Sequence, residues 1–214
     1  MPPAVLNLDL SVRPTPDEVA AGLLNLPSAP NVLPCLCGRL QEEKMSLQEL
    51  GSLLRLDPGL LARVYQMGNR LASVHGDHCL TVEDAINLIG FNRIAAMIAQ
   101  VAKSQVLARP VSLYGLDAEE WWRWSISCAL AAELLAEHTG EDTSIAYTVG
   151  LLHSAGIVAI DEWVLQHAPT VLFMPRGVLC EFIESERALL GCTQAEVGPP
   201  CCGNGACPRS WWNR

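Results

Sequence analysis

The chain has little positive charge. Its 214 residues include 14 Lys and Arg against 23 Asp and Glu, which gives a formal net charge of -9. No run of Lys or Arg occurs anywhere along the sequence. Because nucleic-acid backbones and anionic lipid surfaces attract cationic proteins, this composition argues against both as partners. We therefore predict a protein that binds neither nucleic acid nor membrane.

Export and membrane-spanning signals are also lacking. The N-terminus, MPPAVLNLDLSVRPTP, has no basic stretch followed by a long apolar run, as a secretory signal would have. The apolar run CALAAELLA is broken by Glu133 and falls short of the roughly 18 residues that suggest a spanning helix. We expect a cytoplasmic protein whose scattered Cys residues are reduced thiols. Six of the nine Cys belong to this group, at positions 35, 37, 79, 128, 180 and 192.

Strand signals are missing, and helix signals take their place. No stretch alternates apolar and polar residues between hairpin turns, and no internal repeat has a fixed period. Several stretches instead begin with Ser, Thr or Asp followed three positions later by an acidic residue, a pattern that caps the start of a helix. They are TPDE at 15–18, SLQE at 46–49, TVED at 81–84 and DAEE at 117–120. Apolar residues follow at helical spacing, which predicts an all-α fold.

Particular residues predict where these helices end. Asp57-Pro58 ends one helix and caps the next, because Asp suits the cap and Pro the first helical position. Gly90 allows a sharp turn after the apolar helix that TVED begins, and Asn69 tolerates a left-handed backbone at the end of another. The predicted architecture is a compact multi-helix domain of two lobes. Residues 1–14 form a loose lead-in, 15–198 the domain, and about 15–104 and 117–198 its lobes, which share a groove.

These signals occur in a familiar order. LPSAPNVLPCLCGRL, SLQELGSLLRLDPGLLARVYQMGN and TVEDAINLIGFNRI resemble the N-terminal signature of HDOD domains, the HD-related output domains of bacterial signalling proteins. WWRWSISCALAAELLA and AYTVGLLHSAGIVAI resemble the second part of the same domain. The matching positions are Leu26-Pro27, Pro30, Asp57-Pro58, Asn69, Ala85-Ile86 and Ile89-Gly90. The resemblance covers about residues 17–198 and implies an HD-like helical fold with a role in signalling.

The same resemblance implies where a metal site would lie in a related hydrolase. HD-type hydrolases hold a divalent cation with His and Asp ligands, of which the central pair is His followed by Asp. Here that pair is His153-Ser154, and the positions that often carry His upstream and downstream are Trp124 and Gln194. A hydroxyl is a weak ligand for a hard cation, and an indole has no lone pair to give. We therefore predict no catalytic residue, no metal and no cofactor.

Three roles for His153 remain open: a core histidine bonded to a neighbour, a residual metal ligand, or a contact for a small molecule or partner. Ser125 or Ser154 as a nucleophile beside His153 would need an oxyanion hole and an orienting acid, and the sequence indicates neither. Of the neighbouring tryptophans, 121 and 124 share a helical face while Trp122 points away and is a candidate for a partner surface. The candidate ligand or partner contacts are Trp122, Trp124, His153, Ser154 and Gln194.

Two other groups of potential ligands are interpreted structurally. His75, Asp77, His78 and Cys79 fall in a loop before the TVED helix, where solvated side chains are the simplest interpretation. Cys201, Cys202 and Cys207 do not match a standard zinc spacing. They belong to the stretch PPCCGNGACPRSWWNR, in which Pro199-Pro200 is predicted to stop the preceding helix. We interpret 199–214 as an irregular, non-native tail produced by a frameshift or truncation, which would leave apolar surface uncovered and favour oligomers.

These predictions favour a non-catalytic HDOD-type regulatory module. By resemblance, it would bind another signalling protein in trans, or a small ligand in the groove between the lobes, and a homo-oligomer is an open alternative. A diverged HD-type phosphohydrolase of nucleotides or cyclic dinucleotides is the alternative function. A thiol or zinc sensor built on Cys201, Cys202 and Cys207 is a third. Metal content and phosphodiesterase activity distinguish the first two.

Overall fold

The fold is seen in a computed structural model that describes residues 13–21, 26–29, 31–40, 45–75, 79, 81–103, 109–168 and 179–201. These residues contain α-helices and short 3-10 turns and no β-strand, which confirms the predicted all-α class. The α-helices are α1 (Pro16–Ala20), α2 (Val32–Leu40), α3 (Leu47–Leu54), α4 (Pro58–Ala72), α5 (Val82–Ile89), α6 (Phe91–Lys103), α7 (Ala118–Thr139), α8 (Thr143–Leu152), α9 (Ala155–His167), α10 (Leu179–Leu190) and α11 (Gln194–Cys201). The 3-10 turns are η2 (Ser73–His75) and η3 (Ser112–Tyr114).

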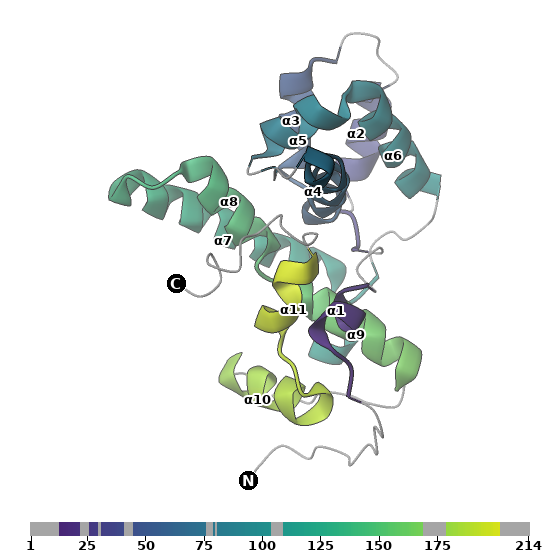
Figure 1. The fold of residues 1–214 in the computed structure, drawn as a ribbon, viewed down its shortest axis with the longest axis vertical. Coiled ribbons are helices and arrows are strands. Elements are labelled where there is room, and N and C mark those ends of the chain that lie inside the picture. The colour runs from purple at the N-terminus through teal and green to yellow at the C-terminus, as the bar shows by residue number, and fades with distance from the viewer. Residues whose placement is uncertain are drawn as a thin grey trace.

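Helices α2 to α6 form one group, drawn at the top of Figure 1. Helix α4 lies at its centre and packs against α5, while α2 packs against α6. The predicted apolar stripe of α4 has its first half in the core, because Leu60 and Val64 are fully buried. Met67 and Leu71, farther along the stripe, are half-buried at the edge of the same core.

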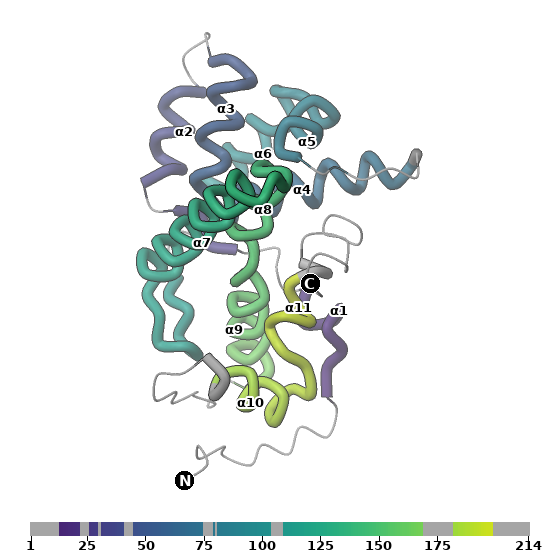
Figure 2. The backbone as a smooth tube through the Cα atoms, turned by 90° about the vertical axis from the view of Figure 1, so that its left-hand side faces the viewer, coloured from purple at the N-terminus to yellow at the C-terminus, as the bar shows by residue number. Residues whose placement is uncertain are grey.

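The second group begins with a long helical hairpin. Helix α7 ends at Thr139 and is followed by Gly140, whose φ of 75° is left-handed. Asp142 then caps α8 by accepting a bond from the backbone N–H of Ile145. The turn folds α8 back along α7 (Figure 1). Helix α9 then runs down beside α11, and α10 crosses below both (Figure 2).

The short helix α1 packs against α9 and α11 rather than against α2 to α6. Figure 2 shows α1 alongside α11, at the opposite end of the molecule from α2 and α3. The chain therefore begins in the second group, crosses to build the first, and returns. Residues 16–20 lie within the stretch 15–104 of the predicted first lobe, yet they contribute to the packing of the second.

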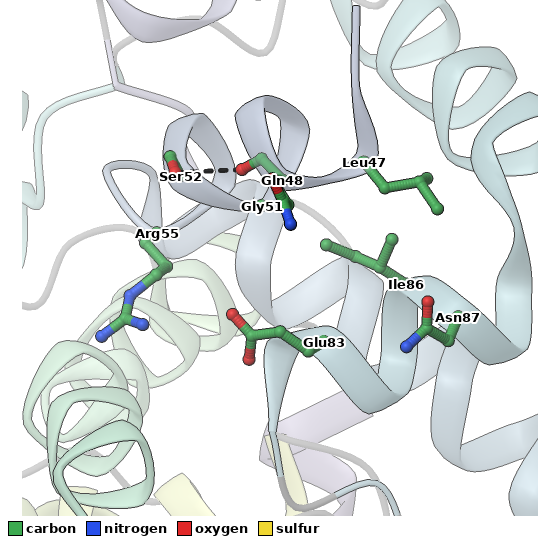
Figure 3. A pocket seen from close by; sticks show the side chains of 8 residues that line it. All are labelled: Leu47, Gln48, Gly51, Ser52, Arg55, Glu83, Ile86 and Asn87. Carbon is green, nitrogen blue, oxygen red and sulfur yellow. Dashed lines mark hydrogen bonds between the residues drawn. The ribbon is translucent and has the colours of Figure 1, made fainter.

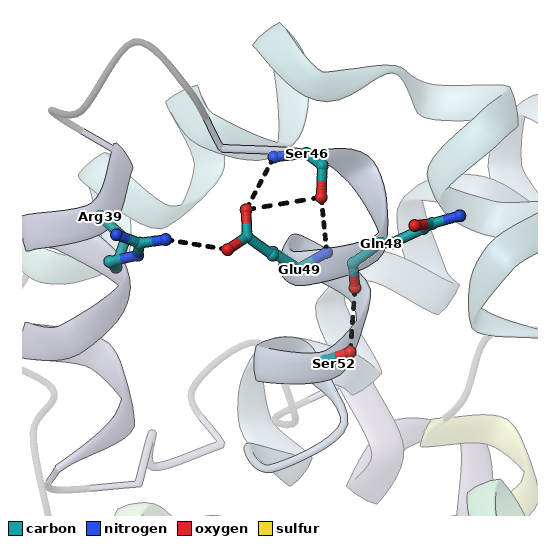
Figure 4. Close-up of polar contacts among 5 residues, drawn as sticks. All are labelled: Arg39, Ser46, Gln48, Glu49 and Ser52. Atoms are coloured by element: carbon teal, nitrogen blue, oxygen red, sulfur yellow. Dashed lines mark hydrogen bonds and ion pairs between the residues drawn. The ribbon is translucent and has the colours of Figure 1, made fainter.

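The predicted capping boxes are present. Thr15, Ser46, Thr81 and Asp117 each cap a helix, and the acidic residue three positions later bonds back to the cap. In Figure 4 the box at Ser46 extends sideways, because Glu49 also accepts a bond from Arg39 of α2 at 2.9 Å. Gly90 ends α5 with a φ of 83°, as predicted. Each of these elements is encoded by a few adjacent residues.

Two predictions about helix ends are wrong. Asn69 lies inside α4 rather than in a left-handed turn: its buried amide donates to the carbonyl of Tyr65 and its oxygen accepts from the backbone N–H of Cys79. Pro199-Pro200 does not stop α11, which continues to Cys201. Gly198 precedes the prolines, and without a Cβ it avoids much of the clash that Pro imposes on the preceding residue. Residues 202–214 of the predicted tail lie outside the described residues.

One stretch in the described part of the chain has the length and hydropathy of a membrane span, Thr143–His167. It comprises α8 and α9, and 67% of its most apolar window is buried inside the fold. A core helix of a folded domain has the same composition, so this stretch is weak support for a membrane protein. Helices α5 and α6 pass the same test only as a pair bent by 100°.

Candidate functional site

The pair His153-Ser154 lies at a break between two helices. Helix α8 ends at Leu152 and α9 begins at Ala155. Ser154 has φ and ψ of -96° and 6°, which lies outside the helical region, and its carbonyl accepts the backbone N–H of Ile157. Because the backbone is not helical at Ser154, the side chains of His153 and Ser154 point in other directions than they would on a straight helix.

The hydroxyl of Ser154 is fully buried and is held by helix α7. Its Oγ lies 3.0 Å from Oγ of Ser125. Ser125 in turn donates to the carbonyl of Trp121 at 3.0 Å, so Ser154 is the donor to Ser125. This chain of two hydrogen bonds fastens the α8–α9 break to α7. It also engages both hydroxyls with partners inside the fold.

His153 is partly buried beside the same helix. Its Nδ1 lies 2.6 Å from the carbonyl oxygen of Gly150, and because a carbonyl only accepts, Nδ1 carries the proton. The ring meets Trp124 edge-on, with centroids 5.2 Å apart and planes at 87°. Burial lowers the pKa of His153, and the bond to Gly150 only partly opposes this. At neutral pH the ring is uncharged, with Nε2 as its only acceptor.

Gln194 occupies a different environment from the pair. It is the first residue of α11, and its backbone N–H donates to Oε2 of Glu186 at 2.8 Å. Its carbonyl lies against α9 so closely that a Cβ on Gly156 would come within 2.1 Å of that oxygen. Only Gly fits at position 156. Of the candidate residues, the structure thus joins Trp124, His153 and Ser154, while Gln194 serves to dock α11 on α9.

These residues do not fit a divalent cation. Within the described part of the chain, no three His, Cys, Asp or Glu side chains come together as a metal would require. His153 offers one nitrogen, its neighbour Trp124 offers none, and the hydroxyl of Ser154 is already bonded. In the second candidate cluster, Cys79 is buried, which raises the pKa of its thiol and keeps it protonated. Residues 76–78 of that loop lie outside the described residues.

Trp122 links the two helical groups. Its Nε1 donates to the carbonyl of Leu56 at 2.8 Å, in the turn between α3 and α4. Close by, Arg55 pairs with Glu133 of α7 at 3.0 Å and lies over the ring of Tyr147, whose hydroxyl donates to the Arg55 carbonyl. The half-buried indole of Trp122 is therefore engaged within the molecule, although it had been a candidate for a partner surface.

Buried carboxylates hold the remaining junctions. Asp57 accepts the backbone N–H groups of Leu60 and Ala29, both at 2.9 Å, and burial raises its pKa to about 6. In the second group, Asp161 is fully buried and accepts bonds from Arg109 and from the backbone N–H of Leu113. Asp57 was recognised from its place before Pro58. Asp161 was not, because its partners lie 48 and 52 residues away.

A surface pocket of about 460 Å³ opens between α3 and α5. Gln48, Ser52 and Arg55 line one side, and Glu83 and Asn87 line the other (Figure 3). The pocket lies within the first helical group and not in the groove expected between two lobes. Sequence patterns did not indicate it, because its two walls are separated by a third helix along the chain.

The comparisons with known proteins agree with this architecture. A family model for the HDOD domain matches residues 26–208. The chain belongs to the HDOD domain family. This confirms the resemblance that the ordered motifs had indicated.

Two solved structures share the HDOD fold seen here. The MmoQ response regulator from Methylococcus capsulatus is 19% identical, with a TM-score of 0.70 over 88% of this chain and 75% of that one. A virulence factor from Campylobacter jejuni is 16% identical, with a TM-score of 0.60 over 91% of this chain and 70% of that one. No match was found among curated proteins. At these identities the likeness concerns the fold.

Proposed function

We propose that this HDOD chain is a non-catalytic regulatory module of signal transduction that acts in the cytoplasm by binding another protein in trans. The observation that carries the proposal is the use of the His153-Ser154 pair. Both hydroxyls of Ser125 and Ser154 and the Nδ1 of His153 are bonded inside the protein. In a hydrolase this position would hold ligands facing a cation.

The electrostatics of the pair support the same conclusion. A metal site needs anionic or lone-pair ligands that converge on one point, and such ligands repel each other until the cation is bound. Here the facing groups are an indole, a neutral imidazole and two hydroxyls in mutual contact. The two hydroxyls and the Nδ1 of His153 are bonded without any ion, and Trp124 meets the imidazole ring edge-on. Such packing suits a structural core better than a reaction site.

Metal content and turnover test the proposal directly. The purified full-length chain, after incubation with Mn²⁺, Fe²⁺ or Mg²⁺ and desalting, is analysed by mass spectrometry and assayed against nucleotides and cyclic dinucleotides. We expect no stoichiometric metal and no phosphate ester hydrolysis, and no difference between wild type and His153→Ala. A stoichiometric metal that is lost in His153→Ala, together with turnover, would overturn the proposal and favour a diverged phosphohydrolase.

A further inference from the structure

The α7–α8 hairpin exposes an apolar face that no described helix covers. Leu130, Leu134 and Leu135 are 49%, 58% and 67% exposed. Leu130 and Leu134 lie on the side of α7 opposite its buried residues Ser125, Ala129 and Ala136, and Leu135 lies next to Leu134 at the flank of that side. Figure 1 shows the end of the hairpin projecting away from the other helices. We call Leu130, Leu134 and Leu135 the leucine face.

The free end of the hairpin, beside the leucine face, is acidic, while Glu133 farther back on α7 is paired with Arg55 of the first helical group. Residues 124–175 contain no Lys or Arg. The exposed acidic residues at the hairpin's end are Glu137, Glu141 and Asp142, and no ion pair is recorded for any of them within the described residues. An apolar strip beside uncompensated carboxylates complements a surface that is apolar in the middle and basic at the edge.

This charge pattern separates the candidate occupants. A second copy of the chain would bring the same carboxylates against this face, and their repulsion would oppose a symmetric dimer. An anionic lipid surface or a nucleic acid would be repelled for the same reason. A helix with apolar residues at i, i+4 and i+7 and flanking Lys or Arg satisfies both features, because it covers the leucines and pairs with the carboxylates.

We propose that the leucine face is the docking surface for a basic amphipathic helix of a partner protein. The inference rests on the proposed function, since it names the surface and the partner chemistry of the binding module. The helix would lie along α7, with its apolar residues against Leu130, Leu134 and Leu135 and its cationic residues toward Glu137 and Glu141.

Fluorescence anisotropy with designed peptides tests this surface. The probes are a labelled Leu/Lys amphipathic helix, a Leu/Glu helix of the same pattern, and a Leu/Lys peptide of the same composition in scrambled order. We expect the full chain to bind only the Leu/Lys helix, and more weakly when salt rises from about 0.05 M to about 0.5 M. Equal binding of the Leu/Glu helix or of the scrambled peptide would overturn the proposal.

Matched variants locate the site. The double variant Leu134→Gln, Leu135→Gln should weaken binding of the Leu/Lys helix about tenfold or more, since exposed anchor residues carry most of the energy of such contacts. The control is Leu88→Gln, Leu165→Gln, which changes leucines that are 43% and 40% exposed on α5 and α9. We expect the control to bind as wild type does, and equal weakening in both double variants would overturn the proposal.

Two further measurements exclude other occupants. Analytical ultracentrifugation of the wild type would overturn the proposal if it showed a dimer that Leu134→Gln, Leu135→Gln dissociates, since the occupant would then be a second copy. Binding of the peptide only after removal of residues 202–214 would overturn it in favour of the chain's own C-terminal segment. The metal and turnover assays of the proposed function are independent of these results, so the two proposals can fail separately.

Discussion

Two helix junctions in this HDOD chain are held to neighbouring segments by different kinds of hydrogen bond. Between α3 and α4, Asp57 caps the next helix and also accepts the backbone N–H of Ala29, so one carboxylate serves two segments. Between α8 and α9, Ser154 makes no side-chain cap, because its hydroxyl bonds to Ser125 of α7 instead. The first junction is closed by a buried charge and the second by neutral groups.

The two junctions differ in how far apart along the chain their bonded residues lie. Asp57 acts on the residue three positions ahead and could be recognised from the sequence alone. Position 59 needs glycine as well, since a Cβ there would come within 2.6 Å of the Pro27 carbonyl oxygen. The hydroxyl of Ser154 bonds to Ser125, which lies 29 residues earlier in the chain, so no short sequence pattern indicates this contact. The second junction is therefore defined by the tertiary packing of α7, α8 and α9.

Substitution of Asp57 should have the largest effect. Asp57→Ala leaves two buried N–H groups without acceptors, and we expect a loss of about 3 kcal/mol in the free energy of unfolding. Asp57→Asn keeps the shape and one acceptor oxygen and should cost about 1 kcal/mol. Urea denaturation followed by circular dichroism measures both. Equal losses in the two variants would mean that the bond retained by Asn contributes nothing to stability.

The packing next to the second junction should be disrupted by adding a methyl group at position 156 of α9. In Gly156→Ala the new methyl group meets the Gln194 carbonyl, so α11 must shift, and we expect a loss of about 2 kcal/mol. The control is Gly38→Ala in α2, where a Cβ meets nothing within 4 Å. That change should stabilise the protein by about 0.5 to 1 kcal/mol, since Ala favours a helix. A stable Gly156→Ala protein would contradict the close contact between α9 and α11.

The hydrogen bond between Ser125 and Ser154 should contribute less to the free energy of unfolding than Asp57 or the close contact at Gly156. Ser154→Ala removes the bond to Ser125, which keeps its bond to the Trp121 carbonyl, so we expect a loss of about 1 kcal/mol. Ser127→Ala, at an exposed position of α7, is the control and should be neutral. A double-mutant cycle with Ser125→Ala isolates the pair, and a coupling energy of zero would show that the two hydroxyls act independently.

The two junctions should also respond to pH in opposite directions. Asp57 has a pKa raised from 3.8 to about 6, so the folded state holds a proton that the unfolded state releases. The contribution of Asp57 to stability therefore falls as pH rises through this window. The pKa of His153 is lowered from 6.5, so its contribution falls as pH drops below 6.5.

Chemical denaturation at two pH values separates these trends. Between about pH 5.5 and about pH 6.5, the Asp57 effect should be of the order of 0.5 kcal/mol. The cost of Asp57→Asn should then be larger at the lower pH, because the variant lacks the protonation that favours the wild type. His153→Gln, which keeps a donor for the Gly150 carbonyl, should show the reverse trend. A cost of Asp57→Asn that does not change with pH would place its pKa near the ordinary value.

Sequence reasoning succeeded where a few adjacent residues decide the outcome. The capping boxes at Thr15, Ser46, Thr81 and Asp117 and the turn at Gly90 are local, and all are present. The ordered motifs also identified the family. The fold class followed from these short-range signals, because helices are built from contacts within a few residues.

The errors arise where distant contacts override local preference. Asn69 stays helical because its buried amide bonds to Tyr65 and Cys79, and no local rule anticipates the second partner. The break at His153-Ser154 has no Pro to announce it. The pocket between α3 and α5 and the carboxylate of Asp161 likewise depend on helices that are brought together only in the folded chain.

The packing of α1 against α9 and α11 has a consequence for synthesis on the ribosome. Helices α2 to α6 lie next to one another along the chain and can assemble as soon as they emerge. The five residues of α1 emerge before them, but their docking partners α9 and α11 are made more than 130 residues later. Docking of α1 therefore waits for the synthesis of α9 and α11, and a nascent chain that stops before them leaves α1 undocked.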